Sequence, residues 1–200
     1  MKKSALVDSA AGFFLNFMLF TVKLYIGVSS NSLPIYCDAF NNLGDTFASL
    51  VAFAGFIMIR RMSEKKSLRA QSLCTFVISI FIIVTGFYFI YNGLERVLYP
   101  VPVAASRRFI IIICATIVIK LMMGFMFRAF NKKAESGVLR ALMLDSFLDC
   151  FITAAALMGF VLVSRVRFAV DGTFAIITGT IITVSAVKNL ISEAKYLINN

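Results

Sequence analysis

The sequence predicts an all-α membrane protein with six transmembrane helices. Of its 200 residues, 60% are hydrophobic and only 15% are charged, and the mean hydropathy is +0.90. Soluble domains bury apolar residues in short periodic stripes, whereas here nearly uncharged runs approach the ~20 residues that cross the hydrocarbon core of a bilayer. The length leaves room for one membrane domain and little else.

Six apolar runs separated by short polar segments give the expected elements. We predict helices at residues 6–28, 33–59, 73–94, 109–127, 138–163 and 168–191. Pro100 and Pro102 separate the third helix from the fourth, because proline cannot continue a helix. The first run is a full span without a clear small-residue cleavage site, so we expect it to stay as a helix. Residues 1–200 are therefore expected to form a single transmembrane domain, with no C-terminal cytoplasmic domain.

The net charge of +10 comes mainly from short segments between the apolar runs. In alternate segments, thirteen Lys and Arg residues fall on one side and five on the other. This distribution follows the positive-inside rule and places both termini in the cytoplasm. It indicates a multi-pass membrane protein, which we expect in a bacterial plasma membrane. The basic loops of the protein are expected to contact anionic lipid rather than nucleic acid.

Two of the predicted helices carry acids near their centres. The second has Asn41 and Asp45, and the fifth has Asp145 and Asp149. An ionised group at this depth costs roughly 2.5 kcal/mol or more, so such residues usually serve a function. Residues four apart share one face of a helix, so each pair points in one direction. If the two faces meet, four oxygen-bearing side chains gather near the bilayer midplane.

Three carboxylates crowded in a low-dielectric region cannot all stay ionised without a compensating charge. Either protons or a divalent cation must be present, and a site that holds them alternately would couple their opposite movements. The alternative is that these groups only hydrogen-bond the helices together, as intramembrane polar residues sometimes do. The matching spacing on two helices favours a cation site made of Asn41, Asp45, Asp145 and Asp149.

The ligand types indicate which metal would bind. The sequence contains no histidine, and its four cysteines are scattered without CxxC spacing. Carboxylate and amide oxygens suit manganese, and also iron(II) or magnesium, better than zinc, which prefers nitrogen and sulfur. Cys37, one turn before Asn41, is a weaker candidate for a soft ligand. Asp38 is a possible accessory residue that guides ions leaving the site, or a hydrogen-bond partner for another helix.

Lys23, Lys120 and Asp171 are further charged residues within the predicted helices. Lys23 is near the end of its helix, where we expect it to snorkel toward the interface. Lys120 is deeper, so an acidic partner is expected for it. The sequence assigns no role to Asp171.

Several stretches resemble the cation diffusion facilitator family. They are SNSLPIYCDAFNNLGD (30–45), GFYFIYNGLERVLYPVP (86–102), the region around Lys120, SGVLRALMLDSFLDC (136–150) and VDGTFAIITGTII (170–182). The resemblance covers nearly the whole chain. It implies a six-helix secondary transporter that exports a divalent metal by proton antiport, works as a homodimer, and needs no enzymatic activity or cofactor.

The resemblance also implies which residues bind the metal. The family's paired ligands on its second and fifth helices fall here on Asn41 with Asp45 and on Asp145 with Asp149. Zinc-transporting members usually have histidine at one or both first positions, so Asn41 and Asp145 resemble the manganese-type pattern. Zinc, iron(II) or cadmium efflux by the same fold is the alternative. The family usually continues into a cytoplasmic metal-sensing domain, which is not expected in these 200 residues.

Two readings from other classes remain open at this point. An intramembrane aspartyl protease would also use two acids on separate helices, but NLG precedes Asp45 where GxG is expected. An inactive membrane scaffold would leave cellular metal content indifferent to loss of the protein.

Overall fold

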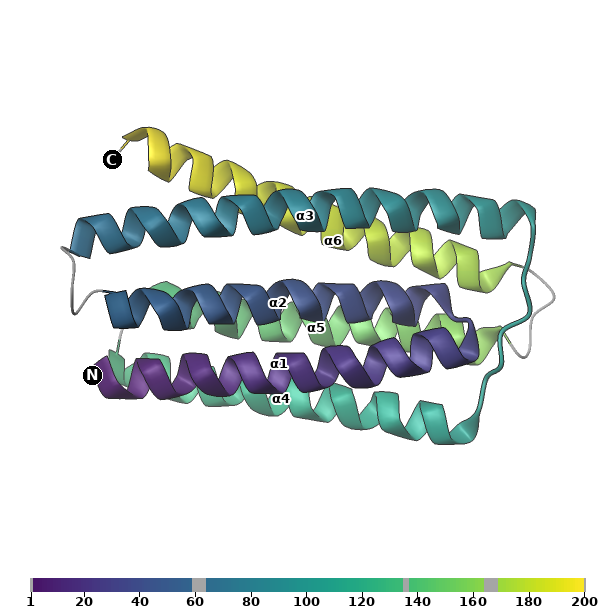
Figure 1. The fold of residues 1–200 in the computed structure, drawn as a ribbon. Coiled ribbons are helices and arrows are strands. Elements are labelled where there is room, and N and C mark those ends of the chain that lie inside the picture. Colours follow the sequence, from purple (N-terminus) through teal and green to yellow (C-terminus); the bar gives the residue numbers. More distant parts are fainter. Residues whose placement is uncertain (1, 59–63, 135–136, 164–168, 200) are drawn as a thin grey trace.

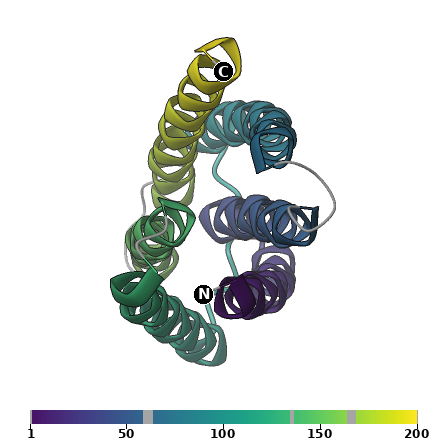
Figure 2. The same cartoon turned by 90° about the vertical axis from the view of Figure 1, so that its left-hand side faces the viewer.

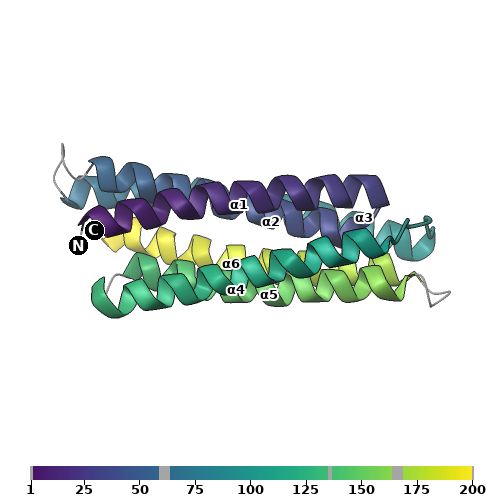
Figure 3. The ribbon, with the colours of Figure 1, turned by 90° about the horizontal axis from the view of Figure 1, so that it is seen from below.

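In a computed structural model of the chain, the described residues are 2–58, 64–134, 137–163 and 169–199. They form six long helices. They are α1 (Lys2–Ser30), α2 (Leu33–Met58), α3 (Glu64–Leu98), α4 (Arg107–Ala134), α5 (Gly137–Leu162) and α6 (Val170–Asn199). The helices lie side by side and alternate in direction, so that both termini lie at the same end of the bundle (Figures 1 and 3). The predicted all-α class with six helices is confirmed.

Five of these helices are long and apolar enough to cross a membrane, judged over the described residues: α1, α3, α4, α5 and α6. The acids and amides of α2 lower its hydropathy. Its 26 residues nevertheless extend about 39 Å at ~1.5 Å per residue, more than the ~30 Å of a hydrocarbon core. Seen along the bundle, α2 lies between α1 and α3 (Figure 2). Its polar side chains Asp38, Asn42 and Asp45 are buried.

The helices extend beyond the apolar runs that predicted them. α3 begins at Glu64 instead of 73 and ends at Leu98, just before Pro100, whereas α6 continues to Asn199 instead of 191. Hydropathy marks only the apolar part of a helix, and the helix continues through polar residues until a breaker stops it. Residues 59 and 168, which end one predicted helix and begin another, lie outside the described residues.

The closest packing joins α3 to α6, and α1–α2 and α4–α5 form further antiparallel pairs. The α3–α6 contact depends on small residues. A Cβ atom added to Gly172 would lie 2.6 Å from the carbonyl oxygen of Gly93 and 2.8 Å from the backbone nitrogen of Val97. Glycine therefore allows the two backbones to approach, as small residues do in many membrane helix pairs.

Asp171 fixes the start of α2. Its carboxylate accepts hydrogen bonds from the Ser32 hydroxyl at 3.1 Å and from the Leu33 backbone N–H at 3.2 Å. Arg96 of α3 donates to the same carboxylate at 2.6 Å. One acid thus satisfies a free backbone donor at the N-terminus of α2 and ties together three helices, which gives Asp171 the structural role that the sequence left unassigned.

Candidate metal site

The three acids predicted to form a site meet between α2 and α5. Asp45, Asp145 and Asp149 each offer a carboxylate oxygen, and these oxygens all lie within 4.8 Å of one another. Asp149 is 1% exposed and Asp45 is 8% exposed. An ion with metal–oxygen distances of about 2.1 Å places opposite ligand oxygens about 4.2 Å apart, so only a small contraction would let all three bind one cation.

Asn41 joins the cluster through its amide nitrogen. Its Nδ2 donates a hydrogen bond of 2.5 Å to Oδ1 of Asp149. The amide oxygen, which the sequence predicted as a ligand, therefore does not face Asp149 in this arrangement. A rotation of the side-chain amide would exchange the two atoms and present the oxygen to a cation.

Lys120 of α4 lies within the same cluster. Its Nζ is 2.9 Å from Oδ2 of Asp45 and also pairs with Oδ2 of Asp149, and the side chain is 1% exposed. The expected acidic partner of Lys120 is therefore a pair of predicted metal ligands. Sequence spacing could not place α4 against α2 and α5, so the contact was not predicted, although a lysine in the middle of a membrane helix was the signal that a counter-ion was near.

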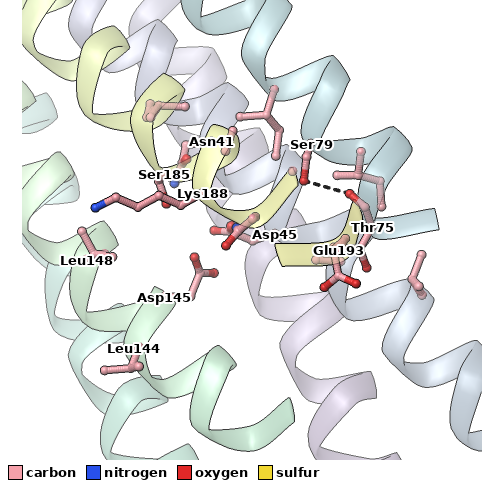
Figure 4. Close-up of a pocket in the computed structure, with 18 of the residues that line it drawn as sticks. Asn41, Asp45, Thr75, Ser79, Leu144, Asp145, Leu148, Ser185, Lys188 and Glu193 are labelled. Carbon is pink, nitrogen blue, oxygen red and sulfur yellow. Dashed lines mark hydrogen bonds between the residues drawn. The ribbon is translucent and has the colours of Figure 1, made fainter. Parts of the chain in front are cut away.

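A cavity of about 640 Å³ leads to the cluster between α2, α3, α5 and α6. Asn41, Asp45 and Asp145 line it at mid-bundle, and Asp145 points toward Asp45 there (Figure 4). The lining then continues to Ser72 and Glu193, which are hydrogen-bonded to each other nearer the end where the termini lie. The acids are therefore approached from the terminal end of the bundle.

Toward the opposite end, a buried ion pair lies next to the cluster. Lys23 of α1 is 0% exposed, and its Nζ lies 2.9 Å from Oδ2 of Asp38 on α2 and donates to Thr153 of α5 at 2.8 Å. The prediction that Lys23 snorkels was wrong, because α1 continues two turns beyond it to Ser30 and keeps it inside the bundle. Asp38 is paired with Lys23 and stands apart from the three-carboxylate group.

Aromatic side chains fill the bundle at the level of the Lys23–Asp38 pair. The rings of Tyr36, Phe40 and Phe89 pack against one another with centroids 5.1 to 5.8 Å apart. Cys37 is buried in the same cluster beside Phe89. This apolar setting makes Cys37 a packing residue and leaves the donor atoms at the site as hard oxygens.

Comparison with known proteins identifies this architecture. Residues 9–198 match the family described as the cation efflux transmembrane domain. The chain is 28% identical over 169 residues to the cation-efflux pump FieF of Shewanella oneidensis, covering 80% of this chain and 55% of that protein. It is 35% identical over 97 residues to zinc transporter 7 of Danio rerio, covering 46% of this chain and 25% of that protein.

The chain is also 32% identical over 108 residues to zinc transporter 7 of Homo sapiens, covering 52% of this chain and 29% of that protein. The chain thus spans about half or less of the length of these relatives. The members of the matching family are transporters and not enzymes, which argues against the aspartyl protease reading. The chain belongs to the cation efflux transmembrane domain family.

Proposed function

We propose that this chain exports a divalent metal cation from the cytoplasm, with manganese as the favoured substrate, in exchange for protons. The observation that carries the proposal is the group of three carboxylates, whose oxygens lie within 4.8 Å at the inner part of the cavity. An all-oxygen donor set with no histidine in the sequence suits a hard cation. The substrate and the coupling are both part of this proposal.

The geometry supports a route for the cation. The cavity lies on the side of the termini, which the positive-inside rule assigns to the cytoplasm. A cation entering there meets Asp145 and Asp45 first, and Asp149 lies behind them outside the cavity lining. Release on the other side requires the helices around Lys23 and Asp38 to separate, while protons replace the metal on the carboxylates.

Zinc is the second candidate substrate. Two of the relatives described above bear the name zinc transporter. Zinc also accepts carboxylate oxygens, although it prefers nitrogen and sulfur. Under this alternative the same three acids would bind zinc, and the proposed site would be unchanged.

Growth of metal-sensitive cells tests the proposal. Cells that lack their own manganese exporter should grow at elevated manganese when they express the wild type. Asp45→Asn, Asp145→Asn and Asp149→Asn should each reduce growth to the level of cells without the protein, because each removes a charged ligand. Glu95→Gln is the matched control, since it neutralises an acid that is exposed on α3.

Manganese resistance that persists in all three aspartate variants would refute the site. Resistance to zinc but not to manganese, lost in the same variants, would make zinc the substrate. Uptake of radioactive metal into proteoliposomes with an imposed proton gradient would then separate proton antiport from other modes.

A further inference from the structure

The charge of the carboxylate group depends on Lys120. Metal ligands must be deprotonated, so three bound carboxylates carry a charge of −3. The ammonium of Lys120 pairs with two of them inside the bundle, which reduces the group to −2. Lys23 and Asp38 neutralise each other and leave this balance unchanged.

A net charge of −2 selects among cations. A divalent ion makes this group, in which Asp45 and Asp149 are buried and Asp145 is half-buried, neutral. A monovalent ion leaves −1 and a trivalent ion leaves +1. A net charge in a low-dielectric interior is costly, so the neutral combination is favoured. Without the lysine, the group would carry −3 and would be neutral only with a trivalent ion.

The position of Lys120 adds a steric condition. Its Nζ lies between Oδ2 of Asp45 and Oδ2 of Asp149, at the place where a cation bound by both residues would lie. Ammonium nitrogen and metal cannot share this position, because a metal approaches carboxylate oxygens to about 2.0 to 2.2 Å. The ammonium group of Lys120 must therefore move away from both oxygens as the metal binds. Because its side chain is attached to α4, its positive charge stays in the same part of the bundle.

We propose that Lys120 is a specificity-determining residue, a tethered cation that matches the carboxylate group to a divalent metal and is displaced from Asp45 and Asp149 when that metal binds. The inference rests on the proposed function, since it needs a metal at these carboxylates. It adds a residue of α4 to a site otherwise made by α2 and α5.

Competition between Mn²⁺ and Tb³⁺ on the purified chain tests the charge balance, with terbium luminescence as the readout. Removing a neighbouring positive charge strengthens binding of a trivalent ion more than that of a divalent ion, since the Coulomb energy scales with ionic charge. In Lys120→Met, the affinity for Tb³⁺ relative to Mn²⁺ should rise at least about tenfold. Lys120→Arg keeps the charge and should keep the wild-type ratio.

The outcomes separate this inference from the proposed function. An unchanged ratio in Lys120→Met, with binding lost in Asp149→Asn, would overturn the role of Lys120 alone. Binding that is equal in the wild type and in Asp149→Asn would overturn the site and the role of Lys120 together.

Amine labelling of the unaltered chain gives a second test that does not depend on the folding of a variant. Saturating Mn²⁺ should increase the labelling of Lys120 severalfold, as measured by mass spectrometry, because the metal frees its Nζ from two carboxylates. Lys23 is an internal control, since it is equally buried but pairs with Asp38. Labelling of Lys120 that is unchanged or reduced by Mn²⁺ would contradict the displacement.

Discussion

Two lysines inside the bundle neutralise acids that would otherwise be costly in a bilayer. Lys120 forms ion pairs with two acids of the carboxylate group. Lys23 forms an ion pair with Asp38 and also donates a hydrogen bond to Thr153. The two lysines differ in setting: Lys120 lies among the three acids that meet between α2 and α5, whereas Lys23 is enclosed beside a single acid. These settings support the proposed substrate-related role of Lys120 and indicate a structural role for Lys23.

Removing one partner of the buried Lys23–Asp38 pair should strongly destabilise the protein. Lys23→Met leaves a buried carboxylate without a counter-charge and should lower the free energy of unfolding by about 3 to 5 kcal/mol. The double variant Lys23→Met/Asp38→Asn should recover most of this loss. Unfolding of the purified protein in detergent, followed by circular dichroism, measures both effects.

The control for this comparison is Lys65→Met, because Lys65 is exposed near the start of α3. A Lys23→Met protein as stable as this control would show that the ion pair does not stabilise the bundle.

Among the elements, α3 and α6 form the most closely packed pair, and glycine allows their approach. Gly172→Ala should force the two helices apart, because the added methyl group would meet the Gly93 carbonyl oxygen at 2.6 Å. Overpacking of this kind costs about 1 to 3 kcal/mol. The measurement is again the unfolding transition in detergent.

Gly12→Ala is the matched control at the α1–α2 contact. Its new Cβ would lie 3.2 Å from the Ser49 hydroxyl oxygen, which a rotation of that side chain relieves. Equal stability of the two variants would contradict the role given to Gly172.

Much of this arrangement follows from local sequence patterns, and the remainder does not. Apolar runs locate the helices because a bilayer requires about 20 apolar residues per span, and the i, i+4 spacing correctly orients Asp145 with Asp149. The partners of Lys120 and Lys23 depend on which helices are neighbours, which spacing within one helix does not contain. The extended ends of α3 and α6 were missed because polar residues continue a helix without adding to its hydropathy.

For the whole molecule, the cavity among the described residues reaches the acids from one end. The cavity extends from Asp45 and Asp145 toward the end that holds both termini, while the Lys23–Asp38 pair and the Tyr36–Phe40–Phe89 rings fill the space on the other side. Exposed apolar side chains such as Phe14, Tyr25 and Phe151 cover the outside of the bundle, as expected for a surface in lipid. Over the described residues the cavity opens toward the terminal end, and the proposed export would require a second state that opens at the opposite end.

Anomalous X-ray diffraction from crystals grown with Mn²⁺ would test the metal site most directly. We expect the strongest manganese peak about 2.0 to 2.2 Å from carboxylate oxygens of Asp45, Asp145 and Asp149, with Lys120 Nζ moved away from two of them. A strongest peak at the outer part of the cavity beside Glu193, with Lys120 still paired to Asp45 and Asp149, would contradict the site.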